Sequence, residues 1–283
     1  MVLYIGDKPV GLMKVVKDTK YIDKTKFGVS IDNLLGDVDE NGVYKARTEL
    51  FTVDMTQVKV VDSFEYSPLP NGATAHCHNA FQHKFHWCGN LVGTIDLSNL
   101  EETSSTGISF EYAFAQTSID TVYLPKNPTV VFLEYSFSSC SQLTDVYIQS
   151  TDLSSALQLR YTFQSCKALK NVHGLDKVVS MALYQTFPGT ALEGEYHFDS
   201  LTTMGASNGA FANTKITKLY FPELTTFSVS NPFGSSKYNS MIQNCADLVE
   251  MHFRADAQAT VEALTGYDSK FWGPDTLTIY FDL

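Results

Sequence analysis

The sequence predicts a β-rich solenoid, α/β by class, in which parallel strands are stacked by about seven coils. Three observations predict this fold. A short segment recurs along the chain, each copy ends in alternating apolar and polar residues, and the composition favours β-structure. Of the 283 residues, 13% are aromatic and only 18% are charged, which is typical of strands rather than of solvated helices.

The repeat is clearest in three segments that align without a gap, of which the last, at Ile242, reads I-Q-N-C-A-D-L-V-E-M-H-F. The copy at Phe137 reads F-S-S-C-S-Q-L-T-D-V-Y-I, and the copy at Phe163 reads F-Q-S-C-K-A-L-K-N-V-H-G. The seven copies begin at Phe85, Phe114, Phe137, Phe163, Phe187, Phe211 and Ile242. Successive starts lie roughly 23 to 31 residues apart, which is the length of one coil of a leucine-rich solenoid.

Each copy contains an L-x-x-V-x-I core, which predicts a short strand with one buried face. One coil cannot cover its own apolar residues, but its neighbours can. We therefore expect the phenylalanines that begin the copies to stack as an interior column. A second apolar segment precedes several of them, over 130–133, 156–159 and 178–183, and predicts a strand on the other wall of the coil.

The cysteines follow the repeat and do not form a metal-binding pattern. The five are Cys77, Cys88, Cys140, Cys166 and Cys245. Their number is odd, and no C-x-x-C pair occurs. Three of them lie three residues after the first residue of a clear copy, where a thiol or hydroxyl can face inward and bond to the backbone of a tight turn. The pattern predicts free, buried thiols.

These F-x-x-C-x-x-L-x-x-V-x-I units resemble the BspA-type leucine-rich repeats of bacterial surface proteins, over about residues 85–253. Related repeat proteins are described as adhesins or as host- and surface-binding modules, so the resemblance implies a binding role. A second resemblance covers only the ends. The opening segment 4–10 is similar to the starts of phage tail-associated proteins, and 26–43 and 278–283 are similar to repeat proteins of gut bacteria and their prophages.

The repeat divides the chain into three parts. Residues 1–50 do not match it and predict a strand-and-turn extension, 51–253 form the solenoid with an N-terminal cap coil, and 254–283 form a C-terminal cap. In that cap we expect Asp256 to begin a helix that continues to about Leu264 and ends at Gly266. A final strand is predicted over 277–281.

Charge and hydropathy exclude several classes of partner. The formal net charge is -11, whereas nucleic-acid binding needs a basic stripe. No apolar stretch is long enough for a membrane-spanning segment, and the N-terminus shows no secretory signal. The sequence leaves the compartment open but favours an extracellular, cell-surface or virion location, with a particle or assembly partner as a further candidate through 1–50.

Two segments contain metal-ligating residues, and in both we favour a structural interpretation. Four histidines lie close together at His76, His78, His83 and His86, but their spacing fits no zinc pattern. A simpler interpretation is that these histidines are polar residues of the first coil. Asp37, Asp39 and Asn41 have the spacing of a calcium loop, yet Thr48 stands where its glutamate should be. We expect a solvated turn there.

Catalytic motifs are missing from the sequence. It has no G-x-S-x-G nucleophile elbow and no glycine-rich phosphate loop. Its carboxylates show no paired spacing. The sequence therefore predicts no enzyme and no cofactor.

The residue between the last two apolar positions of each strand must point outward. In coil order these residues are Asp96, Tyr123, Tyr147, His173, His197, Tyr220 and His252. The outward residues two positions earlier are Thr94, Thr121, Asp145, Asn171, Glu195, Lys218 and Glu250. Because neighbouring strands lie about 4.8 Å apart, the first set should form one continuous ladder. Such a row can stack on sugars or receive a protein segment, or it can simply stabilise the sheet.

The sequence therefore predicts a non-enzymatic recognition or adhesion module. It would bind a carbohydrate or a protein on a bacterial or host surface through the exposed face of the sheet. The alternative is a structural or assembly component of a phage or prophage particle that docks through 1–50.

Overall fold

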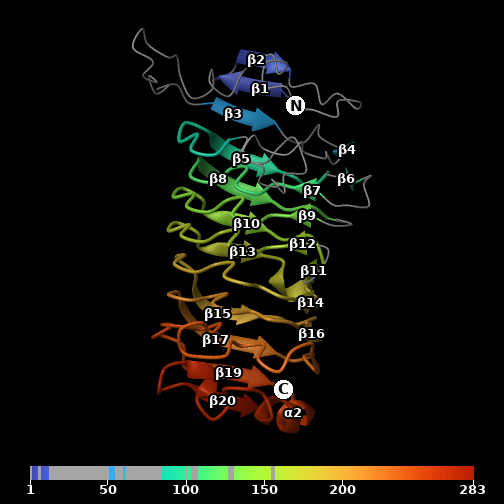
Figure 1. Ribbon diagram of the computed structural model, residues 1–283, viewed down its shortest axis with the longest axis vertical. Coiled ribbons are helices and arrows are strands. Elements are labelled where there is room, and N and C mark those ends of the chain that lie inside the picture. The colour runs from blue at the N-terminus through green and yellow to red at the C-terminus, as the bar shows by residue number, and fades with distance from the viewer. Residues whose placement is uncertain are drawn as a thin grey trace, which may run out of the picture.

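The computed structural model describes residues 2–5, 8–12, 51–54, 60–61, 85–99, 101–102, 108–126, 131–153 and 157–283. Its coils are stacked along the longest axis of the molecule, with β1 near one end and β20 and α2 at the other (Figure 1). This arrangement confirms the predicted β-rich solenoid of stacked parallel strands. Among the described residues, no helix has both the length and the apolar character needed to cross a membrane.

One wall of the solenoid consists of two parallel four-stranded sheets. The first contains β5 (Val92–Asp96), β8 (Ser118–Tyr123), β10 (Asp145–Tyr147) and β13 (Asn171–His173). The second contains β15 (Glu193–His197), β17 (Lys215–Phe221), β19 (Glu250–Phe253) and β20 (Thr278–Phe281). We call the outward side of these eight strands the sheet face. Within each sheet, strand order follows coil order.

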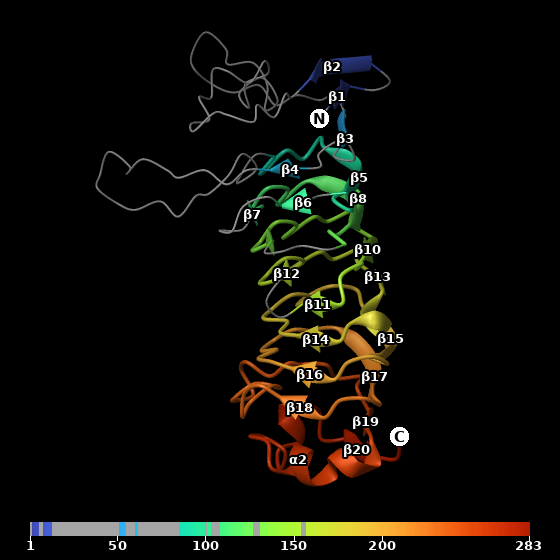
Figure 2. The same cartoon turned by 90° about the vertical axis from the view of Figure 1, so that its right-hand side faces the viewer.

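The opposite wall, seen from the side in Figure 2, is made of short strands. Each of them has two residues. One sheet contains β7 (Ile108–Ser109), β9 (Val131–Phe132) and β12 (Leu157–Gln158). Another contains β11 (Asp152–Leu153), β14 (Ser180–Met181), β16 (Thr203–Met204) and β18 (Thr226–Phe227). Strands β9, β12 and β14 confirm the strands predicted from the apolar segments that precede the phenylalanines.

The N-terminal strands form a small sheet at one end of the stack. Strand β1 (Val2–Ile5) pairs antiparallel with β2 (Lys8–Leu12) and with β3 (Phe51–Asp54), and β3 lies beside β5. Strands from both sides of the predicted boundary at residue 50 thus share one sheet. A further pair joins β4 (Val60–Val61) to β6 (Glu101–Glu102). The calcium-loop residues Asp37, Asp39 and Asn41 lie outside the described residues.

The predicted interior column of phenylalanines is confirmed. Successive rings from Phe85 to Phe211 stack with centroids 5.4 to 5.6 Å apart and planes within 15°. All six rings are fully buried. We call this row the phenylalanine column.

The cysteine position also behaves as predicted. The thiols of Cys140, Cys166 and Cys245 each donate to the carbonyl of the phenylalanine one coil earlier, with Sγ···O distances of 3.0 to 3.1 Å. All three, and Cys88, are free and buried; Cys77 lies outside the described residues. Burial raises the pKa of the Cys88 thiol to about 11. A protonated, buried thiol is a packing group rather than a nucleophile.

Each coil turns tightly around its phenylalanine. In the coil of Phe137, the residues two before and two after it, Tyr135 and Ser139, have left-handed φ values of 55° and 60°. Their N–H groups donate to carbonyls of the next coil, at 3.1 Å for Tyr135 and 2.8 Å for Ser139. The same turn recurs along the stack. We call the edge on which these turns lie the turn edge.

The row of strands on the sheet face is interrupted between β13 and β15 (Figure 1). Gly174 stands where Ile148 stands one coil earlier, has φ 92°, and is followed by a 3-10 helix, η1 (Leu175–Lys177). In β15, Tyr196 occupies the buried strand position that Val146 occupies in β10. Its hydroxyl donates to the carbonyl of Lys170 at 3.5 Å. A ring and a helical turn therefore replace the usual aliphatic contact between coils.

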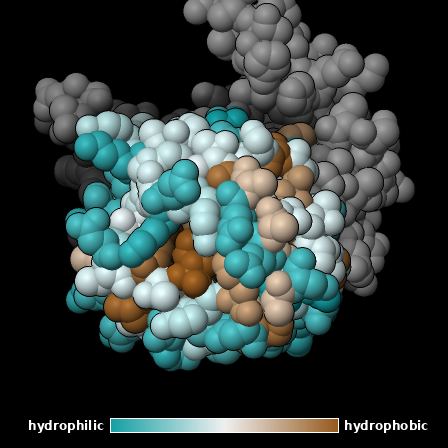
Figure 3. Space-filling view, turned by 90° about the horizontal axis from the view of Figure 1, so that it is seen from below, coloured by the Kyte–Doolittle hydropathy of each residue, from teal (hydrophilic) through white to brown (hydrophobic). Residues whose placement is uncertain are grey.

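The C-terminal cap differs from the prediction at its helix. The helix α2 spans only Gln258–Glu262, after a 3-10 turn, η2 (Ala255–Ala257), and its N-cap is Ala257. The predicted cap at Asp256 is wrong, because that carboxylate binds the guanidinium of Arg254 instead. The predicted final strand is confirmed by β20, which pairs with β19. Viewed from this end, hydrophobic residues form only separate patches on a mainly polar surface (Figure 3).

Candidate functional site: the sheet-face ladder

The outward residues of the first sheet stack in register. The rings of Tyr123 and Tyr147 lie 4.4 Å apart, and those of Tyr147 and His173 lie 4.3 Å apart, with planes within 14°. Asp96 is paired with Tyr123 in the strand register. Its carboxylate accepts the backbone N–H of Ser98 at 2.8 Å, so it also supports the turn after β5.

The second sheet carries a longer run. The centroid distances are 4.3 Å for His197 and Tyr220, 4.7 Å for Tyr220 and His252, and 4.7 Å for His252 and Tyr280. Tyr280 was missed in the sequence, although T-I-Y-F in β20 alternates just as E-M-H-F does in β19. We call the two runs together the sheet-face ladder.

The predicted continuous ladder is wrong at one place. The strands that carry His173 and His197 are not paired, and within the fully described segment 157–283 no ring contact joins the two imidazoles. Their side chains are 48% and 51% exposed. The division follows from the interruption at Gly174 and Tyr196.

Stacking determines which part of each ring a ligand can reach. Inside a run, both faces of a ring are covered by its neighbours at 4.3 to 4.7 Å. The outward edges carry the tyrosine hydroxyls and imidazole nitrogens, which donate and accept hydrogen bonds. The ladder thus offers polar ring edges, least so at His252, whose side chain is only 12% exposed. Ring faces are left uncovered by a ladder neighbour only where a run ends.

Charged side chains beside the ladder hold one another in place. Lys218 Nζ lies 3.0 Å from Glu250 and 3.5 Å from Glu195. Glu250 also meets His252 Nε2 at 3.1 Å, and the other ring nitrogen of His252 lies 2.9 Å from Asp282. The hydrogen bond from Lys218 lowers the pKa of Glu250, and the same contact raises the pKa of Lys218.

A similar contact is present in the first sheet. Asp145 accepts from Asn171 Nδ2 at 2.9 Å and lies 3.3 Å from His173 Nε2. The carboxylates of both sheets therefore orient the imidazoles of the ladder.

Of the four clustered histidines, only His86 lies among the described residues. Its ring stacks on Trp87 at 4.0 Å and on Tyr112 at 5.2 Å. His76, His78 and His83 lie outside the described residues. In the part of the chain that the structure describes, no group of three or more His, Cys, Asp or Glu could hold a metal ion.

The turn edge carries a second aromatic row that was not predicted. Tyr112, Tyr135, Tyr161 and Tyr184 follow one another at 4.7, 4.5 and 5.4 Å, the last contact edge-to-face. A signal for three of them exists in the sequence. The motifs E-Y-A-F, E-Y-S-F and R-Y-T-F recur immediately before the turns at 111–114, 134–137 and 160–163.

These stacked coils, with their buried phenylalanines and parallel strands, define a leucine-rich-repeat protein. A family model described as "BspA type Leucine rich repeat region" matches six copies, over residues 82–182 and 110–239. The matched ranges cover more than half of the chain, which therefore belongs to the BspA-type leucine-rich-repeat family. This family and fold are typical of protein-binding repeat scaffolds without enzymatic activity.

Among solved structures, a leucine-rich repeat protein from Bacteroides ovatus ATCC 8483 is similar to this chain at 15% identity. The similarity covers 88% of this chain and 74% of that chain, with a TM-score of 0.35. No curated protein matches the chain.

Proposed function

We propose that this chain is a non-enzymatic recognition or adhesion module that binds a partner on a bacterial or host surface through the sheet face. The observation that carries the proposal is the order of the sheet-face ladder before any partner arrives. Its rings are stacked, and its imidazoles are oriented by carboxylates. Side chains that are already ordered lose little entropy on binding.

The sequence left two kinds of partner open, carbohydrate and protein, and the ring geometry favours a protein. A sugar ring stacks on an aromatic face, but these faces are covered within each run. Tyrosine is instead among the residues enriched in protein interfaces and their binding hot spots.

The charge of the sheet face favours a basic partner. Asp96, Asp145, Glu195 and Glu250 outnumber Lys218 on the outward strand positions, and the whole chain carries a formal charge of -11. Complementary charge steers association and makes it weaken with salt.

The test measures binding of the fluorescently labelled full chain to intact gut bacteria and to cultured epithelial cells. We expect saturable binding that the Tyr147→Ala/His173→Ala double variant weakens by at least about tenfold. Tyr135→Ala is the matched control, because it also removes one ring from a stacked row, but on the turn edge. Its binding should equal that of the unchanged chain.

Treatment of the target cells separates the two kinds of partner. Binding that is lost after protease treatment and kept after periodate oxidation supports a protein partner, whereas the reverse result identifies a carbohydrate. Equal binding of the double variant and the unchanged chain would contradict a role for the ladder. Self-association without binding to any surface would favour the particle-assembly alternative.

A further inference from the structure

The turn edge changes its character along the solenoid. The left-handed position two residues before the phenylalanine is occupied by Tyr112, Tyr135 and Tyr161 in three successive coils, but by Gln185 and Gly209 in the next two. Where the tyrosines stop, a groove of about 210 Å³ opens along the same edge. Its lining includes Gln164, Ser165, Gln185, Gly189, Asn213 and Gln243.

Three glutamine carboxamides line the groove, and one of them, that of Gln185, packs over Gly209. The side chains of Gln164, Gln185 and Gln243 make no hydrogen bond among the described residues, and no residue of this lining is charged. Each carboxamide has an acceptor oxygen and two donor hydrogens. Three such groups in an uncharged groove match a ligand that is rich in hydroxyls and carries no charge.

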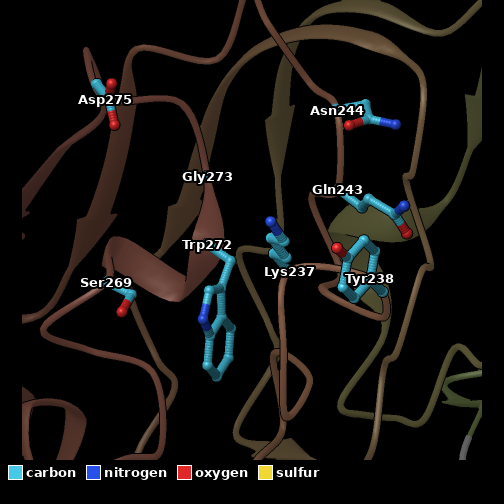
Figure 4. A pocket seen from close by; sticks show the side chains of 8 residues that line it. All are labelled: Lys237, Tyr238, Gln243, Asn244, Ser269, Trp272, Gly273 and Asp275. Atoms are coloured by element: carbon cyan, nitrogen blue, oxygen red, sulfur yellow. The ribbon is translucent and has the colours of Figure 1, made fainter.

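Gln243 also lines a larger cavity, of about 630 Å³, at the C-terminal cap (Figure 4). One side of this cap pocket comes from the loop that carries Lys237 and Tyr238, and the other from the segment that carries Ser269 and Trp272. Because the two hollows share a residue, they adjoin on one edge of the molecule. The volume of the cap pocket lies within the range of small-molecule sites.

The aromatic rings of the cap pocket differ from those of the sheet-face ladder. Neither Trp272 nor Tyr238 stacks on another ring within 157–283, and Tyr238 is 74% exposed. One face of Tyr238 is approached by Lys237 Nζ, 4.9 Å from the ring centroid. The six-membered ring of Trp272 also packs closely on Gly266, where an added Cβ would lie 2.3 Å from it. One side of each ring is thus approached by the protein, and the other side can receive the apolar face of a sugar, which rings inside a ladder run cannot do.

A strained turn presents Trp272 to the pocket. Lys270, Phe271 and Trp272 have φ values of 45°, 52° and 56°, three consecutive left-handed residues with side chains. Such strain is costly and tends to gather at ligand sites. Phe271 is fully buried and packs on Phe233 at 4.2 Å, which holds the turn in this conformation.

We propose that the groove and the cap pocket together bind a neutral, linear glycan. One sugar ring lies against Trp272 and Tyr238, and the following sugars run along the carboxamides of Gln243 and Gln185. The cap pocket is lined by one positive and one negative side chain, Lys237 and Asp275, so its net charge is zero and it favours no net charge in a ligand. A repeating ligand fits because Ser165, Gly189 and Asn213 are equivalent positions in three consecutive coils.

The chain offers a direct reporter for this site. It has two tryptophans, and Trp87 is exposed at the other end of the solenoid. Trp87→Phe leaves Trp272 as the single tryptophan of the full chain. We would titrate this variant with cellohexaose, maltohexaose, mannohexaose and xylohexaose and follow the fluorescence of Trp272.

We expect a saturable change with at least one of the four hexasaccharides. Tyr238→Ala, at a highly exposed position, should weaken that binding by at least about tenfold without loss of fold. The double variant Gln185→Ala/Gln243→Ala should weaken binding of the hexasaccharide more than binding of the matching disaccharide, because only the longer sugar reaches Gln185. Tyr147→Ala/His173→Ala should leave glycan binding unchanged, which separates this site from the sheet face.

Three results would overturn the proposal. One is that none of the four hexasaccharides changes the emission of Trp272. Another is that Tyr238→Ala binds as well as its parent. The third is that a sulfated oligosaccharide of equal length binds more tightly than the neutral ones, since the lining would then select charge.

Discussion

The phenylalanine column and the sheet-face ladder arise from the same coil repeat but differ in their surroundings. The rings of the column lie 5.4 to 5.6 Å apart and are fully buried. The rings of the ladder lie closer together, at 4.3 to 4.7 Å, and remain partly exposed. The stability gained per ring depends on the apolar area removed from water. The column therefore stabilises the fold, whereas the ladder keeps its outer ring edges exposed to solvent.

The largest effect is expected in the column. Phe163→Ala should lower the free energy of unfolding by about 3 to 5 kcal/mol, because it removes a buried ring and leaves a cavity between Phe137 and Phe187. Urea denaturation followed by circular dichroism measures it. Phe163→Leu, which fills more of the space, should cost less. A cost below about 1 kcal/mol for the alanine variant would show that the column is not the core.

The second effect concerns the interruption that divides the ladder. A Cβ on Gly174, at φ 92°, would lie 2.1 Å from the carbonyl oxygen of Ile148. Gly174→Ala should therefore cost at least about 2 kcal/mol, from left-handed strain and from the displaced backbone.

Gly194→Ala is the matched control for Gly174→Ala. Its φ is 82°, but no atom lies within 4 Å of the added Cβ, so only the strain of about 1 kcal/mol applies. Equal losses of unfolding free energy in the two variants would mean that the contact with Ile148 does not constrain the interruption.

A smaller effect is expected in the ladder itself. Tyr147→Ala removes stacking on Tyr123 and His173 but opens no cavity, so its cost should stay within about 1 kcal/mol. The same urea titration serves for comparison with Phe163→Ala. A loss as large as that of the column variant would place Tyr147 in the core and contradict the register of β10.

The smallest expected effect is the change in stability with pH that comes from the charged side chains beside the ladder. Lys218 lowers the pKa of Glu250 in the folded chain. The contact should therefore stabilise the fold above the usual glutamate range and lose its effect as the pH falls through the lowered pKa. Between about pH 7 and pH 3, the urea midpoint of Glu250→Gln should fall less than that of the unchanged chain. When Lys218 is also replaced by Met, the pH dependence of the urea midpoint should differ less between the chains with Glu and with Gln at position 250.

Much of the fold could be predicted because it depends on apolar spacing. The phenylalanines and the L-x-x-V-x-I strands recur at intervals that only stacked coils can bury, and the thiols of Cys140 and Cys166 follow the same period. The outward register of the ladder residues follows from strand alternation. Their role in binding stays a prediction.

Other features depend on single residues that interrupt the pattern. The strand pattern continues across His173 and His197, yet Gly174 and the large Tyr196 separate the two sheets. Asp256 is a good helix cap by residue type, but Arg254, two residues away, competes for its carboxylate. The cap pocket joins residues near 238 and 272, and nothing in the spacing of the repeat indicates that contact.

The most direct test of the difference between column and ladder measures stability and surface binding on the same two variants. Phe163→Leu should lose stability but bind the target cells with unchanged affinity, under conditions in which it remains folded. Tyr147→Ala/His173→Ala should stay within about 2 kcal/mol of the stability of the unchanged chain yet lose at least about tenfold in affinity. A double variant that binds as well as the unchanged chain would contradict the proposal that the sheet-face ladder is the recognition surface.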